Sequence, residues 1–371
     1  MKSNQNIDAF FAVLRAGLWE RKVQLSLFGI IDYNQICHIA EYQTVTGIIA
    51  AGFEYVVDAT VPRETALTLA GYSLELEKRN KAMNLFVKSL ICRLRNSSIN
   101  PLLVKGQGIA QCYERPLWRV SGDVDLLLCD KGYKNALEQL KPYATSVEDE
   151  DSYKKHIALK IDTWLVELHG NLRSRLSYRI DKMMDTLFFD SVVDGNVRQI
   201  SICDEKIKLL GIDNDLLYVF VHILQHFFHG GIGLRQICDW CRLLWYYREE
   251  IDIPLLENRL RSMRLMSEWK AFSAFAVDSL GIPLNGMILY DDNKKWKHKA
   301  LRIKEYVIKS GNFGHRDLKY VNEYSFILRK LRSLFNMVGE MFTHIRVFPF
   351  DSVRFFLYSF CVRLKALIRG E

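Results

Sequence analysis

The stretch VKGQGIAQCYERPLWRVSGDVDLLL, Val104 to Leu128, places two aspartates inside an apolar run. Alternate residues of a strand point to the same face, so Asp123 and Asp125 project together while Val124 and Leu126 point into a core. Neighbouring carboxylates repel each other, and burying them is costly unless a positive partner is present. Magnesium accepts carboxylate oxygens and often substrate phosphates as well. The stretch therefore predicts a strand whose polar face binds Mg²⁺, or Mn²⁺ in its place.

A third carboxylate follows in WLVELHG, residues 164–170. Residues 153–169 predict two short strands around a turn near Asp162. On the second strand Glu167 and His169 share one face. We expect this strand to lie beside the Asp123 strand, so that Glu167 completes a three-carboxylate site.

The residues before the aspartates offer positive groups. Leu102 to Val104 predict a strand that ends at Lys105 and Gly106, and a helical pattern follows. Such a turn presents backbone N–H groups and an ammonium to a phosphate chain. Arg119 offers a second positive group near the same strand.

The remaining pattern is mostly helical. Residues 98–200 alternate strands and helices, which predicts a small mixed α+β unit. We expect an N-terminal helical region over residues 1–97 and a C-terminal helical region over residues 201–371. The helices predicted from apolar spacing cover about residues 7–18, 34–51, 64–95, 254–280, 295–309, 322–345 and 352–369.

Composition bounds the class of protein. The chain has 371 residues, of which 49% are hydrophobic and 25% are charged, as in ordinary globular proteins. The N-terminal stretch lacks the continuous apolar core of a signal peptide, and no uncharged apolar run reaches the roughly 20 residues that span a bilayer. We therefore expect a cytoplasmic protein.

The excess positive charge lies near the C-terminus. Residues 301–371 hold 13 Lys and Arg against 6 Asp and Glu, within a net charge of +8 for the whole chain. The basic tail, residues 352–369, could contact an anionic membrane or RNA phosphates. We favour a tail packed on the neighbouring helices, because Phe355, Phe356, Tyr358 and Phe360 are a large apolar load to leave in water.

Eight scattered cysteines suit reduced thiols in a reducing compartment. Cys238 and Cys241 form a C-x-x-C downstream of His222, His226 and His229, so a zinc site is one alternative. The apolar spacing around the two cysteines favours an amphipathic helix with buried thiols instead.

The combined pattern resembles a known superfamily. A strand leading into Lys-Gly and a helix, then R-x-x-G-D-x-D, then E-L-H on a later strand, is similar to the polymerase-beta-type nucleotidyltransferases. More narrowly, it resembles a mostly uncharacterised bacterial nucleotidyltransferase family. The matching positions are Lys105, Gly106, Tyr113, Pro116, Arg119, Gly122, Asp123, Asp125, Leu126 and Leu127, with weaker similarity at His226, Arg235 and Asp239.

This resemblance implies a polymerase-beta-like sheet flanked by helices, and an enzyme that moves a nucleoside monophosphate from an NTP to an acceptor with two divalent metal ions. Asp123, Asp125 and Glu167 would hold the metals, with Glu167 as an alternative general base. The nucleotide-binding residues would be Lys105, Gly106, Arg119 and Gly122. Possible residues on the substrate side would be His169, His226, Arg235 and Asp239.

Several alternatives stay open. Arg235 and Asp239 are four residues apart and could simply pair along a helix, and His226 could be a core histidine.

Glycosyltransferases also use D-x-D, but a long nucleotide-binding half should precede the motif, whereas one strand does here. The Lys-Gly start, where the superfamily usually has Gly-Ser or Gly-Gly, also resembles toxin-like nucleotidyltransferases that act on RNA or protein. A non-catalytic nucleotide-binding or scaffold protein is the other alternative. The acceptor could be a small molecule, a sugar, a protein or RNA.

Overall fold

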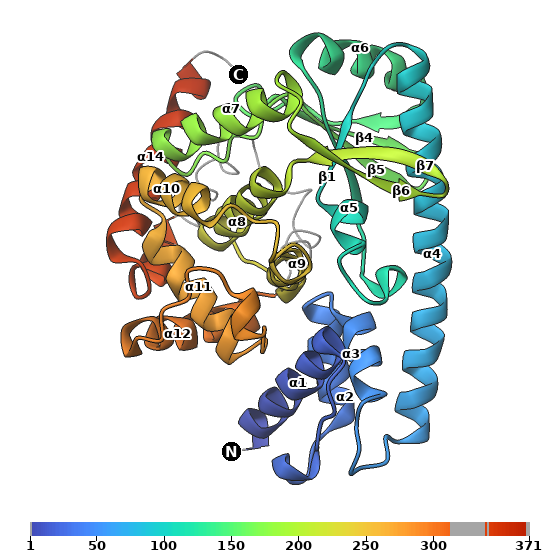
Figure 1. Cartoon of the computed structure of the whole chain (residues 1–371), viewed down its shortest axis with the longest axis vertical. Helices are drawn as coiled ribbons and strands as arrows, with labels where there is room; N and C mark the ends of the chain where they lie inside the picture. Colours follow the sequence, from blue (N-terminus) through green and yellow to red (C-terminus); the bar gives the residue numbers. More distant parts are fainter. Residues whose placement is uncertain (1, 312–337, 340, 369–371) are drawn as a thin grey trace, which may run out of the picture.

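The computed structural model describes residues 2–311, 338, 339 and 341–368. A small mixed sheet lies beside one long helix, with shorter helices at the N-terminal end and a larger group of helices in the C-terminal half (Figure 1). The expected α+β architecture, a small sheet flanked by helical regions, is confirmed. No helix in the described part of the chain is long and apolar enough to cross a membrane.

The N-terminal helices are α1 (Lys2–Trp19), α2 (Tyr33–Tyr42), α3 (Thr46–Phe53) and the 34-residue α4 (Arg63–Asn96). The prediction of a single helix over residues 34–51 is wrong, because the chain turns at Thr44, whose φ is 55°. A β-branched residue rarely adopts such a φ, and never within a regular helix. The turn lets α2 and α3 pack against α1 as separate helices.

Helices α1 and α3 approach closely through glycines. A Cβ added to Gly52 of α3 would lie 2.0 Å from the Val13 carbonyl oxygen of α1, and one on Gly17 would lie 2.0 Å from the Ile48 oxygen. Only hydrogen at these positions permits this separation of the two backbones.

The main sheet has five strands in the order β1-β2-β5-β4-β3. The pair β2 and β5 is parallel, and the other neighbours are antiparallel. The strands are β1 (Leu102–Val104), β2 (Asp123–Leu127), β3 (Ala144–Val147), β4 (His156–Ile161) and β5 (Trp164–His169). The helices of this part are α5 (Gly106–Ala110), α6 (Asp130–Leu140) and α7 (Tyr178–Val192).

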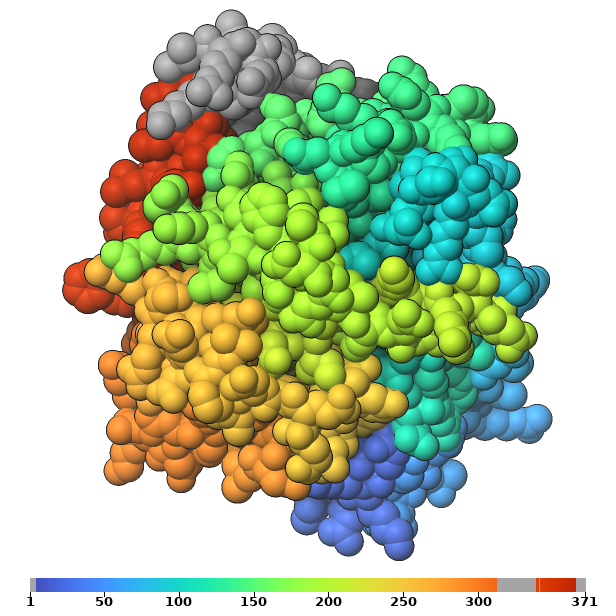
Figure 2. All heavy atoms as spheres, turned by 45° about the horizontal axis from the view of Figure 1, so that its top comes forward, coloured from blue at the N-terminus to red at the C-terminus, as the bar shows by residue number. Residues whose placement is uncertain are grey.

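A second, two-stranded sheet was not predicted from the sequence. Strands β6 (Val197–Ile202) and β7 (Glu205–Leu210) form a hairpin across residue 200, where the expected core ended. Its inner side chains, among them Ile207, join the apolar core of the main sheet. Lys88 of α4 donates to the Cys203 carbonyl in the turn at 2.8 Å. The hairpin therefore reaches the α4 side of the molecule, as the yellow-green atoms beside the cyan ones show in Figure 2.

The C-terminal helices are α8 (Ile212–His229), α9 (Leu234–Tyr246), α10 (Ile253–Met263), α11 (Met266–Asp278), α12 (Lys294–Ser310) and α14 (Pro349–Ile368). The helix expected over residues 254–280 is divided at Arg264, which ends α10 in the left-handed conformation with φ of 59°. The helix expected over residues 322–345 lies largely outside the described residues.

The described part of the basic tail packs on the rest of the chain, as we favoured. Phe355 of α14 is 1% exposed and belongs to the main apolar core. The Ser359 hydroxyl donates to the Arg175 carbonyl at 2.8 Å, and the Tyr358 and Tyr153 hydroxyls lie 2.8 Å apart. These contacts give Phe355 and Tyr358 of α14 partners within the chain, whereas Phe350 of the same helix is 86% exposed.

The glycine contact generates a stability prediction. Gly52→Ala should lower the free energy of unfolding by about 1–3 kcal/mol, because the added methyl forces α1 and α3 apart. Gly71→Ala is the matched control, since nothing lies within 4 Å of its added Cβ in α4. This control should be neutral or more stable by about 0.5–1 kcal/mol. Denaturant unfolding measures both, and equal stability of the two variants would show that the α1–α3 contact is looser.

Candidate active site

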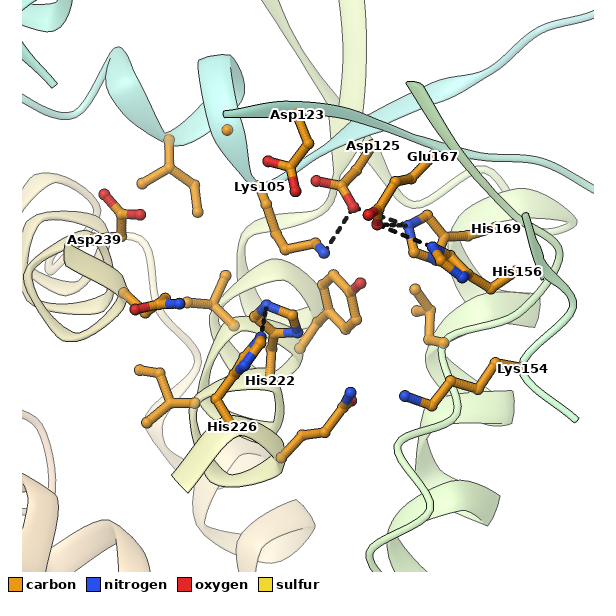
Figure 3. A pocket seen from close by; sticks show the side chains of 18 of the residues that line it. Lys105, Asp123, Asp125, Lys154, His156, Glu167, His169, His222, His226 and Asp239 are labelled. Carbon is orange, nitrogen blue, oxygen red and sulfur yellow. Dashed lines mark hydrogen bonds and ion pairs between the residues drawn. The ribbon is translucent and has the colours of Figure 1, made fainter. Parts of the chain in front are cut away.

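Three carboxylates meet at one end of a cavity. Parallel pairing of β2 and β5 sets Asp125 opposite Glu167, and Asp123 lies two residues from Asp125 on the same face. One oxygen from each of the three carboxylates lies within 4.8 Å of the others. Figure 3 shows them side by side above the cavity. The predicted adjacency of the two strands, with Glu167 facing the aspartate pair, is confirmed.

Positive and hydrogen-bonding groups surround these carboxylates. The Lys105 ammonium lies 2.7 Å from Asp125 Oδ1, and His169 Nε2 lies 2.8 Å from the same oxygen. His156 Nε2 lies 3.0 Å from Glu167 Oε2. One ammonium and two imidazoles therefore contact two of the three acids.

The charges shift the protonation of this cluster. Repulsion from Asp125, followed by burial, raises the pKa of Asp123 above its ordinary value. Burial raises the pKa of Glu167, but hydrogen bonds from His156 and His169 outweigh burial and hold that pKa far below its usual range. Burial lowers the pKa of Lys105, but the Asp125 charge outweighs it and raises that pKa well above the ordinary value. The site thus holds ionised Glu167 and a charged Lys105 beside an aspartate that is reluctant to ionise.

The chain bends sharply where Lys105 enters the site. Lys105 has a φ of 57° and Gly106 a φ of 39°. Two successive residues with positive φ are unusual, and glycine at the second position tolerates the conformation without steric cost. The bend turns the chain from β1 into α5, and it leaves the Lys105 side chain directed at β2 (Figure 3).

Arg119 is engaged by Asp239 of α9. Its Nε and Nη2 donate to the two Asp239 oxygens at 2.8 and 2.6 Å, and the Tyr113 hydroxyl donates to Asp239 Oδ1 at 2.8 Å. Both side chains of the ion pair are 6% exposed. The pair along the helix between Arg235 and Asp239 is therefore not formed. Arg235 instead donates to the Val120 carbonyl at 3.0 Å.

Two histidines of α8 form another wall. His226 Nε2 and His222 Nε2 lie 3.0 Å apart, one helical turn from each other. Burial, with a contribution from the Lys105 charge, lowers the pKa of His226 to about 3 and that of His222 well below its ordinary value. Both imidazoles are therefore neutral near pH 7, and one donates to the other.

These groups share one cavity of about 390 Å³. All eleven residues predicted for the site line this cavity except Gly122, which is exposed at the turn into β2. Further lining residues that the sequence analysis did not assign to the site include Lys154, His156, Tyr218 and His222. Only His222 carried a usable signal, its spacing of four residues from His226 within the predicted C-terminal helical region.

The zinc alternative is not supported. Cys238 and Cys241 are buried in α9, as the amphipathic pattern indicated. Among the described residues, two groups of three or more side chains have the spacing of metal ligands: one consists of Asp123, Asp125 and Glu167, and the other of Glu167 with His156 and His169.

The comparison with protein families agrees with this geometry. The family model described as an uncharacterised nucleotidyltransferase matches residues 31–276, two thirds of the chain and every residue of the cavity. The chain belongs to this nucleotidyltransferase family. Membership places it among the transferases. Searches of curated proteins and of solved structures found no match.

The buried ion pair of this nucleotidyltransferase generates the second prediction. Asp239→Asn should lower the free energy of unfolding by about 3–5 kcal/mol, because it leaves the Arg119 guanidinium buried without a counter-charge. Glu257→Gln is the control, since Glu257 pairs with Arg261 on the exposed face of α10. That loss should be about 0.5 kcal/mol or less. Denaturant unfolding measures the free energy of unfolding of both variants. A loss for Asp239→Asn as small as that for Glu257→Gln would show that water reaches Arg119.

Proposed function

We propose that the protein transfers a nucleoside monophosphate from an NTP to an acceptor, with pyrophosphate as the leaving group and divalent metal ions as cofactors. The observation that carries this proposal is the meeting of Asp123, Asp125 and Glu167 beside Lys105 and Gly106 in one cavity. Family membership supports nucleotidyl transfer in general. The NTP donor and the use of two metals are our inference.

The donor set suits hard divalent cations. Three carboxylates supply oxygen ligands, and their mutual repulsion, expressed in the raised pKa of Asp123, is relieved by a cation. Asp123, Asp125 and Glu167 would hold Mg²⁺ or Mn²⁺. When bound, the metal would neutralise phosphate charge and polarise the phosphoryl group under attack.

The other residues fall into two groups. The Lys105 ammonium now satisfies Asp125, and we propose that it turns to the triphosphate when nucleotide and metal enter, with the Gly106 backbone beside it. Arg119 acts through its ion pair with Asp239, which fixes the loop before β2, and Gly122 shapes the exposed turn of that loop. We assign these two residues a positioning role.

Glu167 is better suited to hold metal than to accept a proton. A carboxylate whose pKa lies far below its usual range is a weak base. His169 contacts both Asp125 and Glu167, and His156 contacts Glu167, so both imidazoles would orient the ligand carboxylates. We therefore move His169 from the substrate side to the metal side of the proposed site.

His226 and Asp239 lie across the cavity from Glu167 (Figure 3), and together with Arg235, which also lines the cavity, they remain proposed substrate-side residues. The close placement of three acids supports metal binding, which a nucleotide-binding scaffold would also need, so label transfer is the measurement that supports catalysis. The label-transfer experiment identifies the class of acceptor, which includes the RNA or protein that a toxin-like enzyme would modify.

Asp123→Asn tests the metal role. This variant keeps the side-chain volume but removes one charge, so the affinity for a non-hydrolysable NTP with Mg²⁺ should fall about tenfold or more. Isothermal titration with and without Mg²⁺ measures the effect. The melting temperature should stay the same or rise, because the substitution relieves repulsion with Asp125.

Asp162→Asn is the matched control, because Asp162 lies at the β4–β5 turn away from the cavity. Equal binding by Asp123→Asn and the parent chain would contradict the metal role. Transfer of label from radiolabelled NTP to acceptors in a cell extract then separates an enzyme from a nucleotide-binding scaffold, and mass spectrometry of the labelled product identifies the acceptor class.

A further inference from the structure

Lys154 is a cavity residue to which the proposed transfer gives no role. It lies in the turn before β4, and its ammonium points into the cavity (Figure 3). Its backbone N–H donates to Asp151 Oδ1 at 3.2 Å, and Arg175 holds the same carboxylate at 2.5 Å. The turn that presents Lys154 is therefore anchored.

The Lys154 ammonium differs from the other cations of the cavity. Lys105, Arg119 and Arg173 have carboxylate partners, and Arg235 donates to a carbonyl. The Lys154 ammonium makes no hydrogen bond or ion pair within the described part of the chain. Burial, with repulsion from Arg175, lowers its pKa to about 8. A largely buried cation without a counter-charge is costly, and an anionic ligand would remove that cost.

The sheet order places Lys154 away from the proposed triphosphate site. Lys105 follows β1, the aspartates lie on β2, Glu167 lies on β5, and Lys154 precedes β4, in the spatial order β1-β2-β5-β4. In phosphoryl-type transfer the attacking and leaving oxygens are roughly in line on opposite sides of phosphorus. If pyrophosphate leaves toward Lys105, the acceptor enters from the β5–β4 side, where Lys154 lies.

We propose that Lys154 binds an anionic group of the acceptor, a phosphate or a carboxylate, and so selects negatively charged acceptors. This proposal rests on the proposed function, because it uses the position of the triphosphate to define the acceptor side. Lys154 is a binding residue here, and the chemistry stays with the carboxylates.

The test fills the nucleotide site first. The parent chain is saturated with Mg²⁺ and a non-hydrolysable NTP, and inorganic phosphate and acetate are titrated separately by calorimetry. We expect at least one anion to bind, and Lys154→Met to weaken that binding about tenfold or more. The anion that binds distinguishes a phosphate-bearing from a carboxylate-bearing acceptor. The affinity for the nucleotide analogue should change by less than about twofold.

Two variants serve as controls. Lys155→Met should bind the anion like the parent, because Lys155 pairs with Asp130 outside the cavity. Lys154→Arg should restore most of the binding, because it keeps the charge. Loss of nucleotide affinity in Lys154→Met would assign Lys154 to the triphosphate and overturn the proposal. If the parent chain binds neither anion, or if Lys154→Met binds the anion as tightly as the parent, the proposal is overturned but the proposed function stays intact. If the parent chain does not bind the nucleotide analogue, both are overturned.

A second measurement needs no variant and is independent of folding defects. Limited acetylation of the unaltered chain with Mg²⁺ and analogue present, followed by mass spectrometry, compares Lys154 with Lys155. Phosphate or acetate should protect Lys154 and leave Lys155 equally reactive. Equal labelling of Lys154 with and without both anions would contradict the proposal.

Discussion

Repulsion among three acids is the constraint on which the site depends. The register of β2 and β5 sets Asp125 opposite Glu167, with Asp123 on the same face. Carboxylates held this close in a poorly solvated place need counter-charges. Lys105, His156 and His169 supply part of that compensation from three separate strand ends. The compensation is incomplete at Asp123, whose pKa stays raised. A divalent cation bound at Asp123 would therefore relieve the repulsion that the protein's own cations leave.

Contacts between distant segments hold the rest of the cavity in place. The Arg119–Asp239 pair ties the loop before β2 to α9, and Asn80 of α4 donates to the Leu117 and Arg119 carbonyls at 2.8 Å. Gln43 of the N-terminal region accepts a hydrogen bond from the Leu234 N–H at the start of α9. The helical regions therefore position the walls of the site as well as covering the sheet. Residues on both sides of position 200 line the cavity, so the proposed division of the chain at that position does not divide the site.

The charges also suggest how the two substrates are separated. Lys105 and the aspartates form one end, whereas Lys154 lies on the β4 side of Glu167, and its ammonium has no hydrogen-bond or ion-pair partner among the described residues. The neutral pair His222 and His226 forms a wall that carries no charge near pH 7. A cavity built in this way favours an anionic molecule at each end. This distribution of charge is consistent with a nucleotidyltransferase, the family to which the chain belongs. It directs the search for an acceptor to negatively charged molecules.

The sequence alone predicted the strand at Asp123, the choice of Asp123, Asp125 and Glu167 as the acids of the site, and the α+β class. These features depend on two-residue alternation and on turn residues, which are local signals. It did not reveal the β6–β7 hairpin, whose inner residues gain their burial from the main sheet. It also left the partner of Asp239 open: Arg235 is four residues away, yet Arg119, 120 residues away, binds it. Lys154 and His156 gave no local sign of a site. Tertiary structure decided these points, because ion pairs and cavity walls depend on which distant segments pack together, and helix or strand periodicity does not contain that information.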